Sequence, residues 1–271
     1  MPELPEVEVV KEGLKKLIKP TDPIEQIEFL RKDLRWNLPH SFTEKIKGQK
    51  ILKLFRRAKY ILLETEKFYL ISHLGMTGSW RKDTQRKQHD HIVLSLESGT
   101  QLIYNDPRRF GAFDIIVKET LKKDKKFVHL GPEPLLVDEF HGTYLFSKSR
   151  RRKVPIKAFI MDQKVVVGVG NIYASEALFL AGIRPLASAS RLTKVQSEKL
   201  VTAIQHVLKA AIDLGGSSIR DYKQASGESG GFQEQHFVYG RGQQACRKCR
   251  GLIRSQFLSG RNTFWCVKCQ K

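Results

Sequence analysis

Residues 50–55 read KILKLF, and five further runs of the same character follow: KYILLE at 59–64, FYLISHL at 68–74, HIVLSL at 91–96, QLIYND at 101–106 and AFDIIV at 112–117. Each run is short and rich in aliphatic, β-branched and aromatic residues, as β-strands are. The turn signals ESG and NDP separate some of the runs. The pattern predicts an antiparallel β-sandwich or barrel of roughly eight strands over residues 46–117.

A short amphipathic helix is expected almost at the N-terminus. Pro5 suits the first turn of a helix. Apolar residues recur behind it at helical spacing, and lysines fall off their face. The apolar positions are Val7, Val10, Leu14 and Leu17, and the lysines are Lys11, Lys15 and Lys16.

The chain changes character near residue 130. LGPEPLL at 130–136 holds two prolines and a glycine and indicates a domain boundary. Residues 215–235 are rich in Gly and Ser and indicate a loop. Helical patterns occupy residues 137–148, 155–161, 171–181 and 194–214.

We therefore expect an α+β protein of three domains. A β-sandwich with an N-terminal helix spans residues 1–131, a helical domain spans 132–236, and a cysteine-containing tail spans 237–271. With 271 residues, of which 41% are hydrophobic, the chain is long enough to bury a core in more than one domain.

The chain is strongly basic. It has 48 Lys and Arg against 28 Asp and Glu, which gives a formal net charge of +20. Such a field attracts polyanions, so nucleic acid is the first partner to consider. A ribosome-associated or merely very soluble basic protein would have the same charge, and charge alone does not separate these interpretations.

We expect a cytosolic protein with no membrane segment. No apolar run approaches the roughly 20 residues that cross a bilayer. The opening MPELPEVE has acids where a signal peptide would have bases. A reducing compartment argues against disulfides for the four cysteines.

The cysteine spacing predicts a metal site. Cys246-x2-Cys249 is followed after sixteen residues by Cys266-x2-Cys269, which is the spacing of a tetrahedral four-sulfur zinc site. Such a site has no open coordination position, so one Zn²⁺ would stabilise the fold rather than perform chemistry. Four unrelated free cysteines are the alternative. The segment between the cysteine pairs fits a β-hairpin with a basic tip, either a DNA contact or plain scaffold.

Ten blocks of the sequence resemble the bacterial formamidopyrimidine-DNA glycosylase (8-oxoguanine-DNA glycosylase) family, in family order and over the whole chain. They are PELPEVE at 2–8, RRAKY at 56–60, HLGMTGS at 73–79, HDH at 89–91, DPRRFG at 106–111, LGPEPL at 130–135, VVGVGNIYASEALF at 166–179, GGSSIRDY at 215–222, VYGR at 238–241 and GRNTFWC at 260–266. The resemblance implies an N-terminal β-sandwich, a helix–two-turns–helix domain and a C-terminal zinc ribbon.

The resemblance implies chemistry at the N-terminus. Removal of Met1 would leave Pro2 with a secondary amine, and an α-amino group titrates near pH ~8, so part of it is neutral and nucleophilic at neutral pH. In the family this amine attacks C1′ of the damaged nucleotide and forms a Schiff base. Glu3 would be the acid/base that assists ring opening, and Glu6 would help to move protons. Ordinary helix capping is the alternative role for both carboxylates.

Two basic residues complete the implied catalytic set. Lys59, in RRAKY, would be a general acid or an electrostatic partner, although a lysine on a strand is usually only a solvated residue. Arg261, at the tip of the ribbon, would bind phosphates and assist the second elimination. β,δ-Elimination would then leave a one-nucleotide gap.

Chemistry at C1′ of a stacked nucleotide requires base flipping. By resemblance, Met76 and Phe110 would intercalate and Arg108 would face the orphaned cytosine. The alternative is that Met76 and Phe110 are core residues.

The resemblance also implies a phosphate grip by His89, Lys153 and Asn171, although the basic run at 148–157 also fits a solvated surface. Arg220 would lie near the loop that closes over the extruded base. EQHFVYG at 234–240 departs from the family pattern at this loop.

Three functions remain open from the sequence. The first is a bifunctional glycosylase and apurinic-site lyase for 8-oxoguanine and formamidopyrimidines in double-stranded DNA. The second is an endonuclease VIII-like enzyme for oxidised pyrimidines, and the third is a non-catalytic zinc-ribbon DNA-binding protein. We expect a monomer, because an asymmetric lesion offers no two-fold site. No nucleotide cofactor is expected, because neither a P-loop nor a dinucleotide fingerprint occurs.

Overall fold

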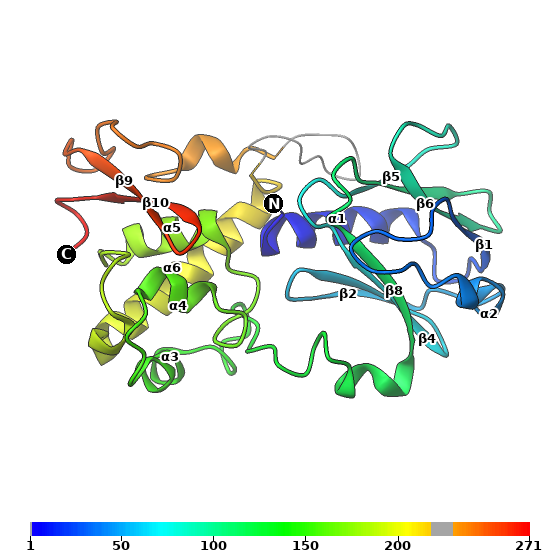
Figure 1. Ribbon diagram of the computed structural model, residues 1–271, viewed down its shortest axis with the longest axis horizontal. Coiled ribbons are helices and arrows are strands. Elements are labelled where there is room, and N and C mark those ends of the chain that lie inside the picture. The colour runs from blue at the N-terminus through cyan, green and yellow to red at the C-terminus, as the bar shows by residue number, and fades with distance from the viewer. Residues whose placement is uncertain (1, 218–229) are drawn as a thin grey trace. The chain divides into compact units, whose positions relative to one another are not determined.

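The protein folds into two compact units (Figure 1). The computed structural model describes residues 2–217 and 230–271. The first unit comprises residues 1–128 with 214–231, and the second comprises 129–213 with 232–271. Division into three domains at residues 131 and 236 stays a prediction.

The first unit contains two four-stranded antiparallel sheets. One sheet has the strand order β1 (Ile24–Phe29), β6 (Asp90–Leu96), β7 (Gln101–Asn105) and β5 (Ser79–Lys82). The other has the order β2 (Lys53–Arg57), β3 (Tyr60–Glu64), β4 (Phe68–His73) and β8 (Ala112–Val117). One apolar cluster draws residues from both sheets, so the predicted β-sandwich is confirmed.

Six of these strands coincide with the six runs that the sequence singles out. The other two, β1 and β5, fall outside those runs. In β1, IEQIEF, only Ile24 and Ile27 are fully buried, and β5, SWRK, is a short edge strand in which only Trp80 is buried. Neither strand has the continuous apolar character of the central strands, which explains why the pattern missed them.

Helix α1 (Leu4–Leu17) contacts the edge strands β2 and β5, one from each sheet. Its buried face includes Val7, Val10 and Leu14, as the periodicity predicts. The helix thus closes one side of the sandwich and fixes the N-terminus against it. Short helical turns complete the unit: η1 (His40–Phe42), α2 (Thr43–Ile46) and η2 (Lys118–Lys123).

The second unit is mainly helical. Its elements are α3 (Gly142–Ser149), α4 (Ile156–Met161), α5 (Asn171–Leu180), η3 (Ala189–Arg191), α6 (Lys194–Asp213) and η4 (Phe232–Gln235). Helix α3 starts five residues later than the expected 137, because the ring of His141 accepts the amide of Tyr144 and caps the helix there. Helix α5 packs against α4, α6 and the C-terminal hairpin.

The C-terminal hairpin consists of β9 (Ile253–Leu258) and β10 (Arg261–Cys266). Ser259 and Gly260 form its two-residue turn with φ of 48° and 75°, the left-handed values that a tight hairpin turn requires. No helix among the described residues is long and apolar enough to cross a membrane.

Candidate functional site

The N-terminus of α1 brings three predicted site residues together. Pro2 is buried, and Glu3 and Glu6 are each 2% exposed. Glu3 and Glu6 form a capping box in which the Glu3 amide donates to Glu6 Oε2 over 2.8 Å. The carboxylates therefore perform the helix-capping role. Glu3 directly follows Pro2 in the chain, and Glu6 lies in the first turn of the helix.

A second segment of the first unit covers Glu6. The amide of Ser217 donates to Glu6 Oε1 over 2.8 Å. A Cβ built on Gly216 would lie 3.0 Å from the Glu6 side chain, and Gly216 has φ +84°, so glycine is needed for this approach. Both Glu6 oxygens thus accept backbone amides, and Ser217 is tied to the N-terminal helix. Arg220 lies outside the described residues.

Lys59 lies in the turn between β2 and β3 rather than on a strand. Ala58, before it, has φ +54°, and the Lys59 side chain is largely buried. Arg56 donates Nη1 to the carbonyl of Ala58 over 2.9 Å and Nε to Glu8 of α1 over 2.7 Å. Arg56 therefore fixes the turn that carries Lys59 and ties it to the helix that follows Pro2. The sequence patterns did not single out Arg56 or Glu8.

His73, at the end of β4, is a buried histidine near Lys59. Burial, together with the positive charges of Lys59 and Arg35, lowers its pKa to about 4. Its Nδ1 accepts the amide of Gly75 over 3.0 Å, which places the ring proton of the neutral form on Nε2. His73 is thus a neutral side chain at pH 7 that fixes the start of the loop HLGMTG.

The predicted intercalating residues lie on two adjoining loops. Met76 and Phe110 are 37% and 48% exposed, so neither is a core residue. The Arg108 guanidinium lies 5.0 Å from the centre of the Phe110 ring. A Cβ on Gly75 would meet the backbone of Phe110 and Gly111 at 2.3 Å, so the loops touch at this glycine.

Buried polar contacts hold these loops in place. The Asp106 carboxylate accepts the hydroxyl of Thr77 and, over 2.7 Å, the amide of Gly111. The amide of Arg108 donates to Thr77 Oγ1. His89 is exposed beside them, with φ +70°, and its carbonyl accepts the amide of Asp106 over 3.0 Å. His89, Met76, Arg108 and Phe110 therefore belong to one braced surface of the first unit.

Asn171 is the first residue of α5 in the second unit. Gly168, before it, has φ +79° in the GVGN turn. The Asn171 amide nitrogen lies 3.5 Å from the hydroxyl of Tyr239, and its buried Oδ1 has no partner among the described residues. The side chain therefore has one buried polar atom without a partner at the N-terminus of α5.

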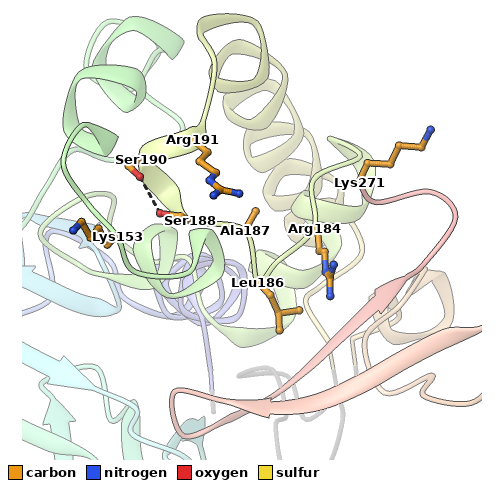
Figure 2. A pocket seen from close by; sticks show the side chains of 8 residues that line it. All are labelled: Lys153, Arg184, Leu186, Ala187, Ser188, Ser190, Arg191 and Lys271. Carbon is orange, nitrogen blue, oxygen red and sulfur yellow. Dashed lines mark hydrogen bonds between the residues drawn. The ribbon is translucent and has the colours of Figure 1, made fainter.

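Lys153 is exposed in the segment before α4 and lines a cavity of about 760 Å³ (Figure 2). It belongs to the basic run at 148–157. Lys157, by contrast, is 1% exposed, and its ammonium donates to the Asn262 carbonyl over 3.2 Å and to Thr263 Oγ1 over 3.0 Å. Lys153 therefore stays available to solvent or a phosphate, whereas Lys157 is a buried anchor that the sequence patterns did not predict.

Arg261 begins β10 and is exposed at the hairpin tip. Its Nη1 lies 3.2 Å from the Gly260 carbonyl. Together with Lys157 and Ser259 it lines a pocket of about 270 Å³ between α4 and the hairpin. Since Lys157 anchors Asn262 and Thr263, the base of the tip is fixed while the Arg261 guanidinium stays accessible.

Glu176 on α5 is a buried carboxylate that the sequence patterns did not single out. It accepts the amides of Phe237, Val238 and Tyr239 over 2.7, 3.0 and 2.8 Å. Burial raises its pKa, while these three N–H donors act in the opposite direction. Glu176 positions the segment leading into the cysteine site and holds Tyr239 beside Asn171.

The four cysteines form a candidate metal centre. Their sulfurs all lie within 4.8 Å of one another, with 3.9 Å between Cys246 and Cys269 and 3.4 Å between Cys249 and Cys266. A tetrahedral zinc site with Zn–S bonds of about 2.3 Å has sulfurs about 3.8 Å apart. The thiol set and its spacing therefore fit a metal ion held by four sulfurs.

The structure places Pro2, Glu3, Glu6 and Lys59 in the first unit, and Lys153, Asn171, Arg261 and the cysteines in the second.

Two family patterns match the chain. The N-terminal domain of formamidopyrimidine-DNA glycosylase matches residues 1–113, and the H2TH domain of the same enzyme matches residues 130–223.

Relatives are similar over the full length. The chain is 50% identical over 273 residues to formamidopyrimidine-DNA glycosylase of Bdellovibrio bacteriovorus, with 100% of both chains covered. It is 46% identical over 274 residues to the Haemophilus influenzae protein of the same description, with 100% of this chain and 99% of that one covered.

Solved structures are similar in fold. A Lactococcus lactis FPG (MutM) complex with a Fapy-dG containing DNA has a TM-score of 0.90 at 34% identity, covering 99% of this chain and 100% of the other. A MutM complex with carbocyclic 8-oxo-G containing DNA has a TM-score of 0.90 at 34% identity, covering 100% of both chains.

Proposed function

Since the chain belongs to the formamidopyrimidine-DNA glycosylase family, we propose that it acts in base-excision repair on oxidised purines of duplex DNA. It removes 8-oxoguanine and formamidopyrimidines and then cuts the strand as an apurinic-site lyase. The observation that carries this proposal is the burial of Pro2 beside Glu3 and Glu6 at the start of α1.

Pro2 is the proposed nucleophile. With Met1 removed, the lone pair of its nitrogen attacks C1′, and the bond from C1′ to the base breaks with its electron pair leaving on the base. The positive end of the α1 dipole lowers the proton affinity of the amine, which favours the nucleophilic form, whereas Glu3 and Glu6 act in the opposite sense.

Glu3 acts in this scheme as the acid/base that protonates the sugar as its ring opens, and Glu6 assists proton movement. The resulting iminium is an electron sink, so loss of a C2′ proton breaks the 3′ phosphate ester. A second elimination breaks the 5′ ester. The burial of both carboxylates supports these roles, because desolvation strengthens their interaction with positive charge that develops at the sugar.

Lys59 supplies a further positive charge at this site. Its burial and its braced turn suit a group that donates a proton or stabilises a leaving base, rather than a solvated surface lysine. Arg261 binds the phosphates next to the lesion and assists the second elimination, a role that fits its exposed position on a fixed hairpin.

Met76, Phe110 and Arg108 replace the extruded nucleotide in the base stack. The exposure of two apolar side chains on braced loops supports this role, because such residues otherwise cost free energy in water. Arg108 faces the unpaired cytosine.

His89, Lys153 and Asn171 grip phosphates, and Arg220 acts with the lesion loop. For Asn171, the position at the first residue of α5 supports this role, because phosphates bind at helix N-termini. One structural zinc ion bound by the four cysteines maintains the hairpin that carries Arg261.

Borohydride trapping tests the proposal. Borohydride reduces an iminium to a stable amine, so incubation with a duplex containing 8-oxoguanine opposite cytosine should give a covalent protein–DNA adduct that maps to Pro2. An undamaged duplex is the control. Absence of the adduct on the damaged duplex, or full activity of protein that retains Met1, would overturn the mechanism.

The same assay separates the alternatives. Preferential trapping on thymine glycol would indicate an enzyme for oxidised pyrimidines. Strand cleavage unchanged in both Pro2→Gly and Glu3→Gln would indicate a DNA-binding protein without this chemistry.

A further inference from the structure

A basic pocket lies in the second unit, with a volume of about 760 Å³ (Figure 2). Two segments of the chain and its last residue form it. The basic pocket is defined here by Lys153, Arg184, Ser188, Ser190, Arg191 and Lys271. Of these residues, only Lys153 belongs to the proposed phosphate contacts, and the proposed function assigns no role to Arg184, Arg191 and Lys271.

No acidic side chain of the described chain lines the basic pocket. Among the described residues, the side chains of Lys153, Arg184, Arg191 and Lys271 form no hydrogen bond or ion pair. Elsewhere the chain does pair its arginines, as Arg81 with Asp90 at 2.7 Å. Four cations around one hollow repel one another, so the arrangement favours binding of an anion.

Backbone hydrogen bonds hold the segments that carry these cations in place. The amide of Arg184 donates to the Lys271 carbonyl, and the amide of Lys271 donates to Gly182, both over 3.1 Å. On the other side, the amide of Ser190 donates to Arg152 over 2.8 Å, and Pro155 forms a β-bridge with Ser188. Because the backbone is already ordered, binding of a ligand would cost mainly the rotamer entropy of the Lys and Arg side chains.

The basic pocket also offers neutral donors. The hydroxyls of Ser188 and Ser190 lie 2.9 Å apart and bond to each other. Either hydroxyl can turn to donate to a phosphate oxygen, since its hydrogen is free to rotate. The pocket therefore combines guanidinium, ammonium and hydroxyl donors, which is the set that contacts nucleic-acid backbones.

We infer that the basic pocket binds phosphodiester groups of duplex DNA that flanks the lesion-containing segment. This inference rests on the proposed function, because Lys153 is both a proposed phosphate contact at the lesion and a wall of the pocket. Figure 2 shows the cations spread from Lys153 through Arg191 and Arg184 to Lys271. A spread row suits successive phosphates of one strand better than a single small anion, which needs converging donors.

Counterion release gives the expected size of the effect. The logarithm of the binding constant falls with the logarithm of salt concentration with a slope of about −0.9 per phosphate neutralised. Arg184→Gln/Arg191→Gln removes two of the cations. The double variant should therefore reduce the slope by up to about 2 on DNA long enough to reach the pocket.

The experiment compares duplexes of about one and about three helical turns (roughly 10 and 30 base pairs), each with a central lesion. Binding is measured by fluorescence anisotropy over a series of salt concentrations. Lys199→Gln/Lys209→Gln is the matched control, because it removes two exposed charges from α6 of the same unit, outside the pocket. Arg184→Lys/Arg191→Lys keeps the charge, and thermal unfolding checks the fold of each variant.

The inference predicts a weaker affinity and a smaller slope for Arg184→Gln/Arg191→Gln on the long duplex only, with the lysine variant close to wild type. The inference is overturned if Arg184→Gln/Arg191→Gln and the α6 control have the same affinity and salt slope on the long duplex. It is also overturned if inorganic phosphate binds the pocket while Arg184→Gln/Arg191→Gln binds the long duplex as the wild type does. If the wild-type protein forms no borohydride adduct with 8-oxoguanine duplexes, the proposed function is contradicted instead. Failure of the proposed function and failure of the pocket inference are therefore distinguishable.

Discussion

Arg56 donates its Nε to the Glu8 carboxylate over 2.7 Å, which joins β2 to α1 across 48 positions of the chain. The Arg56 side chain is 8% exposed and that of Glu8 is 21% exposed, so the pair is largely shielded from water. The hydrogen bonds of Lys11 and Arg56 lower the pKa of Glu8 against the effect of burial, which acts to raise it. The ion pair thus fixes the Lys59 turn relative to the helix that begins behind Pro2.

Arg56→Gln should destabilise the fold by about 2 kcal/mol, because it leaves a shielded carboxylate with one partner fewer. Urea unfolding measures the change. Arg86→Gln is the matched control, since Arg86 also bonds a glutamate, Glu28, at 2.6 Å but in an exposed position. The control should lose less than about 0.5 kcal/mol. Equal losses in the two variants would contradict the structural role of the Arg56 pair.

Gly75→Ala should reduce excision of 8-oxoguanine by roughly 10-fold or more, because its Cβ would meet backbone atoms of Phe110 and Gly111 at 2.3 Å and displace the loop that carries Phe110. Single-turnover excision measures the effect. Gly48→Ala is the control: Gly48 has φ +73° like Gly75 at +63°, but no atom lies within 4 Å of its Cβ position. Similar activity of the two variants would contradict the role of the contact at Gly75.

The cysteine site was predictable because its signal is local. Two Cys-x2-Cys pairs fix the ligand set by spacing alone, and the four sulfurs do meet. The six apolar runs predicted six strands for the same reason, while the weakly patterned edge strands β1 and β5 needed the tertiary structure.

Long-range partners were not predictable from the sequence patterns. Glu176 accepts amides of residues 61 to 63 positions away, and Lys157 reaches Asn262 across 105 positions. No periodicity links such residues, because only the folded chain brings them together. The position of Lys59 in a turn was missed because Ala58 adopts a positive φ, for which an alanine gives no signal.

Removal of the proposed zinc ion should unfold the hairpin. A strong chelator should abolish binding to damaged duplex, since four close thiols no longer share a cation and would repel one another when ionised. Circular dichroism and anisotropy follow the loss, and Zn²⁺ but not Mg²⁺ should restore both signals, because thiolates prefer the softer ion.

Arg261→Gln separates the hairpin fold from its function. This variant should keep its metal and its fold, because Arg261 is exposed and, among the described residues, its guanidinium donates only to the carbonyl of Gly260. Its strand cleavage should fall by roughly 10-fold, the loss expected for one charge-assisted contact of about 1.4 kcal/mol. Loss of the metal in Arg261→Gln would contradict the separation of fold and function. Full activity after chelation would contradict the structural role of the ion.

His73 should make the first unit sensitive to mild acid. Its folded pKa of about 4 lies below the ordinary 6.5, so between these values the unfolded chain binds a proton that the folded chain excludes. The stability contributed is therefore fully present above pH 6.5 and falls by about 1.4 kcal/mol per pH unit as pH drops toward 4. Urea unfolding at pH 7 and pH 5 measures this slope.

His73→Asn removes the titration but keeps an acceptor for the Gly75 amide, so it should flatten the dependence of stability on pH. His206→Asn, at an exposed position of α6, is the control and should leave the wild-type slope unchanged. His236, buried in the second unit with its pKa also lowered to about 4, should produce the part of the slope that survives in His73→Asn. An unchanged slope in both His73→Asn and His236→Asn would mean that neither ring is kept neutral by burial.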